Sequence, residues 1–146
     1  MKYEVVRLEE KTVVGLGAST GNADPNMSEI ISNLWKNLYQ PGLYNSINNR
    51  INTYAIGLYS DYTKDQYHVL AGFEVSKAEN KELTVKTIPA GNYAKFSIHG
   101  NMVTAVSEAW NEIWNMDLER TFTGDFEEYL NDDWENADIL IYVAIK

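Results

Sequence analysis

A short acidic and aromatic stretch, GDFEEYLNDDWEN at residues 124–136, carries the side chains best suited to chemistry. Within it, Glu127 and Tyr129 are two positions apart, so in a strand both side chains lie on one face. A carboxylate among aromatic rings can neutralise a cation that the ring faces also attract. A buried carboxylate with a raised pKa can instead hold a proton and act as an acid or a base. Glu127 is therefore the main candidate for a ligand-binding or catalytic residue.

The other acidic residues have simpler interpretations. Asp125 and the segment 132–136 are expected to form a solvated loop. Glu128 has the opposite parity to Glu127 and is expected to face away from any groove. A second carboxylate, Glu74, lies in a strand of the first half of the chain and is predicted to share the groove with Glu127. Two such carboxylates would suit a dication, or acid–base chemistry on a neutral electrophile.

The elements that must position these residues follow from apolar periodicity and from turn residues. In chain order, we expect two extended pieces (3–20), a helix (27–38), a hairpin (53–61 and 66–77), a strand pair (83–100), a helix (103–114) and two further strands (126–130 and 137–146). The order strand, strand, helix, strand, strand thus occurs twice.

The two halves also match residue by residue. Trp35 corresponds to Trp110, 75 positions later, on the apolar stripe of each predicted helix. We therefore expect an α+β fold of two pseudo-twofold related βαββ-type halves, at about 1–78 and 83–146, in one domain spanning 1–146. A cleft between two such halves is a preferred place for a ligand.

Strand parity predicts where that cleft lies. The β-branched row within 139–145 is expected to face the helices, and the small residues Ala55, Gly57 and Gly72 are expected to leave a hollow on the opposite face. The predicted structure is an antiparallel sheet with two helices on one face and a ligand cleft on the other. The candidate ligand contacts, from the strands of that face and from one helix edge, are Glu127, Tyr129, Glu74, Tyr142, Tyr59, Leu70, Gly72, Gly57 and Trp110.

Composition narrows the classes of function. The 146-residue chain has a net charge of −9 and no basic patch, which argues against direct binding to nucleic acid. The chain has no cysteine, and His68 and His99 have no second ligand at ligating spacing, so we assign no metal and no cofactor. No apolar run is long enough for a signal peptide or a membrane helix, and we expect a cytoplasmic protein.

Two motifs resemble those of a known family. The stretch IPAGNYAKFSIHG at 88–100 precedes a tryptophan-bearing helix, and FEEY at 126–129 precedes the last strand. In this order, and in a doubled chain, they resemble the gyrase-inhibitor-like (GyrI-like) effector-binding domain, which also ends several multidrug-responsive bacterial transcription activators. The resemblance covers essentially the whole chain. It implies two βαββ-type halves, an aromatic-lined cleft, and a glutamate, here Glu127, that contacts lipophilic cations.

The resemblance favours a stand-alone binder of hydrophobic, often cationic, small molecules that acts in sensing or sequestration. Some relatives look like hydrolases that open the cyclopropane rings of DNA-alkylating natural products, and in that role Glu127 or Glu74 would position or deprotonate water. A gyrase-inhibitor-like module that binds a basic protein partner is a second alternative. The sequence contains no helix-turn-helix pattern, so a direct role as a transcription factor is not expected. The oligomeric state stays open.

Overall fold

Eight strands form one sheet in this computed structural model, which describes residues 1–79 and 82–146. The elements are β1 (Glu4–Leu8), β2 (Lys11–Thr20), α1 (Met27–Leu38), α2 (Pro41–Tyr44), β3 (Arg50–Ser60), β4 (Tyr67–Val75), β5 (Thr84–Ile88), β6 (Gly91–Gly100), α3 (Thr104–Trp114), β7 (Asp125–Tyr129) and β8 (Ala137–Ile145). Each expected helix and strand is present, and α2 is an additional short helix. The charged stretch KAENKE at 77–82 is predicted from the sequence as a turn or short linker, and residues 80 and 81 within it lie outside the described residues.

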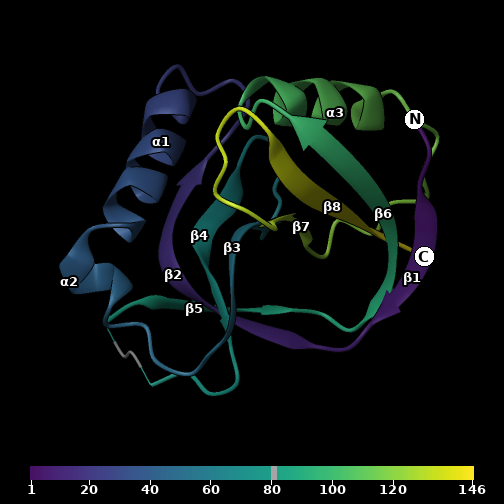
Figure 1. Ribbon diagram of the computed structural model, residues 1–146. Helices are drawn as coiled ribbons and strands as arrows, with labels where there is room; N and C mark the ends of the chain where they lie inside the picture. Colours follow the sequence, from purple (N-terminus) through teal and green to yellow (C-terminus); the bar gives the residue numbers. More distant parts are fainter. Residues whose placement is uncertain (80–81) are drawn as a thin grey trace.

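The order of the strands reflects the doubled sequence. The sheet runs β1-β6-β8-β7-β3-β4-β2-β5, and all its neighbours are antiparallel (Figure 1). Exchanging each strand of the first half with its counterpart in the second, β1 with β5 through to β4 with β8, gives the same order read from the opposite edge of the sheet. The two central strands, β3 and β7, join the halves. The predicted α+β class is confirmed.

Helices α1 and α3 lie on the same face of the sheet, one over each half. Helix α1 packs against β2 and β4, and α3 packs against β6. Cross-strand partners share a face of a sheet. Ala71 lies opposite Gly57, Gly57 opposite Glu127, and Glu127 opposite Ile141, so this row of side chains joins the face under α1 to the face under α3.

The other face of the sheet closes on itself. One cluster of side chains on that face includes Val6 from the edge strand β1 and Ile88 from the opposite edge strand β5. In a flat sheet these edges would be about seven strand spacings of roughly 4.8 Å apart. The sheet is therefore curled, as Figure 1 shows. The face away from the helices is the inside of the curl, and it is filled by core side chains.

The predicted parity of β3 was wrong. Ala55, Gly57 and Tyr59 were expected to face away from the helices, but they pair with Phe73, Ala71 and Val69 and share their helix-bearing face. The inside of the curl needs large apolar side chains, and Ile56 and Leu58 fill it. Because the side-chain period of a strand is two, such an error moves every side chain to the other face.

Among the described residues, no helix is both long enough and apolar enough to cross a membrane.

Candidate functional site

Glu127 is a buried carboxylate held by three hydrogen-bond donors. Its side chain is on the helix-bearing face of β7, and the residue is 2% exposed. The indole Nε1 of Trp110 donates to Oε2 at 2.7 Å, and the hydroxyl of Tyr59 donates to the same oxygen at 3.1 Å. The hydroxyl of Tyr129 donates to Oε1 at 2.7 Å. The carboxylate is thus fixed from both sides.

The residues around Glu127 are pairs related by the duplication. Tyr59 and Tyr129 occupy equivalent positions on β3 and β7, and both bond the carboxylate. Trp110 on α3 bonds it directly, and its counterpart Trp35 on α1 packs edge-on against Tyr129, with ring centroids 5.3 Å apart at 76°. We call Glu127, Tyr59, Tyr129, Trp35 and Trp110 the carboxylate cage. Each half of the chain contributes one tyrosine and one tryptophan to it.

Gly57 makes room for the carboxylate. It is the cross-strand partner of Glu127 and its counterpart in the first half. A Cβ at position 57 would lie 3.0 Å from Oε1 of Glu127 and 3.2 Å from Cζ2 of Trp35, closer than side chains normally pack. Glycine in a strand often marks a close approach of this kind. Here the approaching group is a side chain of the protein itself.

Burial dominates the electrostatics of the cage. Loss of solvent raises the pKa of Glu127, and the hydrogen bonds from Trp110, Tyr129 and Tyr59 oppose that rise without cancelling it. Burial, followed by the nearby carboxylate, raises the pKa of Tyr59 and Tyr129 well above the ordinary value, so both hydroxyls stay protonated and donate. None of the ion pairs in the described part of the chain includes Glu127. Its charge has donors around it but no compensating cation among the residues that the structure describes.

Asp125 is also buried, which corrects the expectation of a solvated residue. It is 0% exposed and lies on the same face of β7 as Glu127. Its Oδ2 accepts from Nη2 of Arg120 and from the hydroxyl of Tyr62, both at 2.6 Å, and its Oδ1 accepts from the backbone N–H of Ala144 at 2.8 Å. Asp125 was assigned to a loop, whereas β7 begins at this residue. Its parity with Glu127 was the signal that could have placed it.

Four of the predicted contacts lie on the inside of the curl rather than with Glu127. Leu70 and Tyr142 belong to the core of that face, where Tyr142 stacks on Phe126 at 4.5 Å. Glu74 is paired with Lys11 at 3.3 Å. A Cβ on Gly72 would collide with a backbone carbonyl of the neighbouring strand β2, so glycine there permits close strand approach. The structure therefore separates Glu74 from Glu127 by the thickness of the sheet.

Two further expectations about the acidic stretch are confirmed. Glu128 faces away from Glu127, because it pairs with Ile56 and Leu140 on the inside of the curl. Residues 132–136 are all exposed, with Trp134 at 55%. Trp35 belongs to the cage, although the candidate ligand contacts did not include it. Its place on an apolar helix stripe is typical of a core residue. Its match to Trp110 in the repeat was the signal for it.

The described residues contain no group of three histidine, cysteine or acidic side chains that could hold a metal ion.

Comparison with known proteins identifies the family. The profile of the family described as "Cass2: Integron-associated effector binding protein" matches residues 4–145. The chain belongs to this family. The match spans both halves, and the predicted GyrI-like resemblance is confirmed.

Individual relatives agree with this assignment. The protein YobU of Bacillus subtilis (strain 168), named for a suggested role as a transcriptional regulator, is 30% identical over 167 residues, which covers 97% of this chain and 96% of YobU. The structure of SAV2435 bound to tetraphenylphosphonium has a TM-score of 0.83 at 18% identity, covering 100% of this chain and 94% of that one. The integron cassette protein VCH_CASS2 of Vibrio cholerae has a TM-score of 0.79 at 24% identity, covering 99% and 95%. At these identities the two structures show a shared fold.

Proposed function

We propose that this protein binds hydrophobic cations through the carboxylate cage, and that it does so in the cytoplasm to sense or sequester them. The observation that carries the proposal is a buried carboxylate with no cationic partner among the described residues, surrounded by two tryptophans and two tyrosines. A desolvated cation would gain from the negative charge and from the ring faces together.

The physical cost of burying Glu127 supports this proposal. Burying an unpaired carboxylate is unfavourable, and three hydrogen bonds only partly offset that cost. A bound cation would supply the compensating charge at the same place. The relative SAV2435 was solved with tetraphenylphosphonium, a cation of this chemical kind.

Entry of a ligand requires a side chain to move, because Glu127 is only 2% exposed. Trp35 is the cage residue best suited to move. Its side chain is half-buried, packs against Tyr129 and lies over Gly57. Among the described residues, its indole makes no hydrogen bond to the carboxylate. Trp110, by contrast, is buried and bonded to Glu127.

The direct test is calorimetric titration with tetraphenylphosphonium. Glu127→Gln keeps the shape of the side chain and removes its charge, so it should weaken binding about tenfold or more, equivalent to about 1.4 kcal/mol or more. Glu128→Gln is the matched control, since the neighbouring acid lies on the other face of the sheet, and its affinity should stay within about twofold of wild type. Equal affinities of wild type and Glu127→Gln would refute the proposal.

A hydrolase is the second candidate, because burial raises the pKa of Glu127 and two tyrosine hydroxyls lie beside it. Glu127 would take a proton from water, whose oxygen would bond to a cyclopropane carbon of an alkylating substrate. The electron pair of the broken carbon–carbon bond would move onto a conjugated oxygen, to which Tyr59 or Tyr129 would donate. Glu74 takes no part in this version, since it lies on the other face. Consumption of many equivalents of such a compound, abolished in Glu127→Gln, would support the enzyme, and stoichiometric protection would exclude it.

A further inference from the structure

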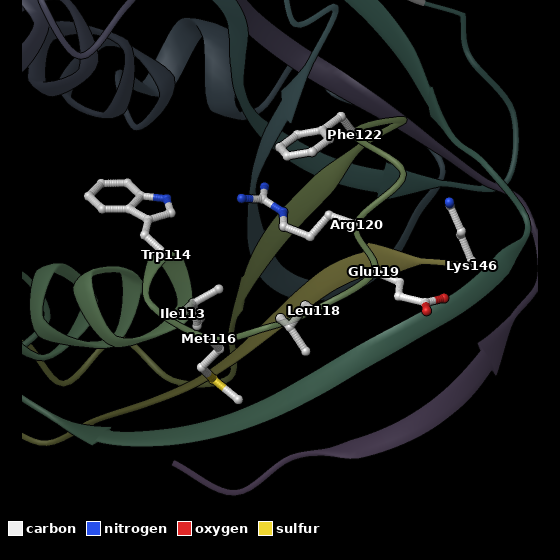
Figure 2. A pocket seen from close by; sticks show the side chains of 8 residues that line it. All are labelled: Ile113, Trp114, Met116, Leu118, Glu119, Arg120, Phe122 and Lys146. Carbon is white, nitrogen blue, oxygen red and sulfur yellow. The ribbon is translucent and has the colours of Figure 1, made fainter.

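A pocket beside α3 is separate from the carboxylate cage. It has a volume of about 410 Å³ and is lined by Ile113, Trp114, Met116, Leu118, Glu119, Arg120, Phe122 and Lys146 (Figure 2). Small-molecule sites commonly have volumes of about 300–1,000 Å³, with largely apolar walls and a few polar groups. The volume of this pocket falls in that range, its wall combines apolar side chains with charged ones, and none of its lining residues belongs to the cage. We call it the Arg120 pocket.

Two large aromatic rings of this pocket are left open to solvent. Trp114 is 53% exposed and Phe122 is 52% exposed. The backbone of Phe122 has φ of +55°, in the left-handed region that costs a bulky residue free energy. The Phe122 ring packs edge-on against Tyr62, with ring centroids 5.7 Å apart at 82°, and lies against the Arg120 guanidinium group. These contacts place the half-exposed ring at the pocket wall.

Arg120 has hydrogen-bond donors to spare. Its Nη2 donates to Asp125, and its guanidinium carbon lies 4.3 Å from the centroid of the Phe122 ring. Its Nε is buried and has no hydrogen-bond partner among the described residues, which is an unfavourable state for a buried donor. In the view of Figure 2 the guanidinium group lies between the rings of Trp114 and Phe122. The Nε itself is closed to a ligand, but the Arg120 side chain is 14% exposed and lines the pocket, where a ligand oxygen could accept from the exposed part of the guanidinium group.

The side chains that line the Arg120 pocket favour a planar carboxylate as the ligand. A guanidinium group binds a planar carboxylate through two parallel N–H donors, and it can do so while a second acid is bonded behind it. Trp114 and Phe122 offer surfaces for stacking against a flat ring. Lys146 adds a positive charge at the other end of the pocket, where Glu119 offsets it.

We propose that the Arg120 pocket binds planar aromatic carboxylates, with Arg120 holding the acid and with Trp114 and Phe122 holding the ring. This site does not depend on the cation-binding proposal, because it uses no residue of the cage. The two sites are neighbours, since the rings of Trp110 and Trp114 are 6.3 Å apart.

Calorimetric titration of the full chain with 2-naphthoate and with neutral 2-naphthamide tests the proposal. The two probes share their ring and differ in charge, and charge-assisted hydrogen bonds are about twice as strong as neutral ones. We expect naphthoate to bind at least about tenfold more tightly than the amide. Equal affinities, or no naphthoate binding up to millimolar concentration, would overturn the proposal.

Substitutions in the pocket wall test whether 2-naphthoate binds there. Trp114→Leu should weaken naphthoate binding about tenfold. Trp134→Leu alters a tryptophan of similar exposure in the 131–136 loop and should leave the affinity within about twofold. Arg120→Lys keeps a positive charge opposite Asp125 but loses the planar fork, so it should also weaken binding about tenfold. Thermal unfolding checks that each variant folds. An unchanged affinity in Trp114→Leu would contradict the assignment.

Glu127→Gln separates the two proposals. Its naphthoate affinity should equal that of wild type, and a large change would place naphthoate in the cage and overturn this inference. Titration of the same samples with tetraphenylphosphonium tests the cation-binding proposal separately.

Discussion

At the scale of single residues, the protein keeps one carboxylate in an environment that opposes its charge. Glu127 and Asp125 are both buried, but Asp125 has Arg120 as a partner, whereas the donors to Glu127 in the described part of the chain are all neutral. The balance of burial and hydrogen bonds leaves the pKa of Glu127 raised. Its ionised form is therefore less stable in the folded protein than in the unfolded chain.

This shift predicts a pH dependence of stability. A raised pKa means that the folded protein binds the proton more tightly than the unfolded chain does, whose glutamate has its ordinary value of 4.5. The stabilisation is fully present below that ordinary value and is lost as pH rises through the folded-state pKa. The free energy of unfolding of wild type, relative to Glu127→Gln, should thus fall from pH 4 towards neutrality. Urea denaturation at a series of pH values measures it, and a flat or rising difference would contradict the shift.

Gly57 offers a second prediction at this scale. Gly57→Ala would place a methyl group 3.0 Å from Oε1 of Glu127 and 3.2 Å from Trp35. Overpacking of this kind costs about 1–3 kcal/mol, and it should also weaken binding of tetraphenylphosphonium. Gly42→Ala is the matched control, because a Cβ there meets no atom within 4 Å and alanine favours the short helix α2. Equal melting temperatures of the two variants would count against the packing role of Gly57.

At the scale of elements, β7 is the strand that connects the carboxylate cage and the Arg120 pocket. Its alternation puts Asp125, Glu127 and Tyr129 on the helix-bearing face and Phe126 and Glu128 inside the curl. Asp125 ties the strand to the 115–124 segment through Arg120, and it also bonds Tyr62. The same segment forms much of the Arg120 pocket. The first residue of β7, Asp125, therefore holds the segment that forms the pocket wall, while Glu127 and Tyr129 of the same strand belong to the cage.

The two buried acids of β7 should differ in their effect on stability. Asp125→Ala leaves Arg120 without its ionic partner and removes the acceptor for Tyr62 and for the Ala144 N–H, so it should cost about 3–5 kcal/mol. Asp132→Ala, in the exposed loop, should stay within about 0.5 kcal/mol of wild type. Chemical denaturation gives both values. A loss below about 1 kcal/mol for Asp125→Ala would show that its network is not structural.

At the scale of the whole molecule, the duplicated halves depend on each other. The edge strand β1 pairs with β6 of the second half, and β5 pairs with β2 of the first. The core inside the curl contains residues of both halves, such as Val13 and Tyr93. Neither half can bury this core alone.

Separate fragments test this dependence. Residues 1–78 and 83–146, expressed alone, should lack a cooperative thermal transition, because each would expose its share of the common core and an unpaired sheet edge. Mixed together, they should recover the circular dichroism spectrum of the intact chain. Cooperative unfolding of either fragment alone would show that the halves are independent units.

The sequence by itself determined the α+β class, the order of the elements, the duplication and the opposite faces of Glu127 and Glu128. Each of these rests on local patterns: helical and strand periodicity, turn residues, and parity within one short strand. The matched tryptophans at positions 35 and 110 indicate the duplication without any knowledge of how the two helices pack.

Only the tertiary structure decided where the faces of the sheet lie and which residues meet. Parity groups the side chains of a strand, but it does not say which group faces the helices when both faces are buried. Curling buries the inside with large residues such as Ile56 and Leu58, which leaves Gly57 and Tyr59 under the helices with Glu127. Glu74, expected beside Glu127, is on the far side of the sheet for the same reason. The buried partnership of Asp125 and Arg120, with the pocket beside it, depends on how the 115–124 segment folds back, and no local pattern in the sequence specifies that path.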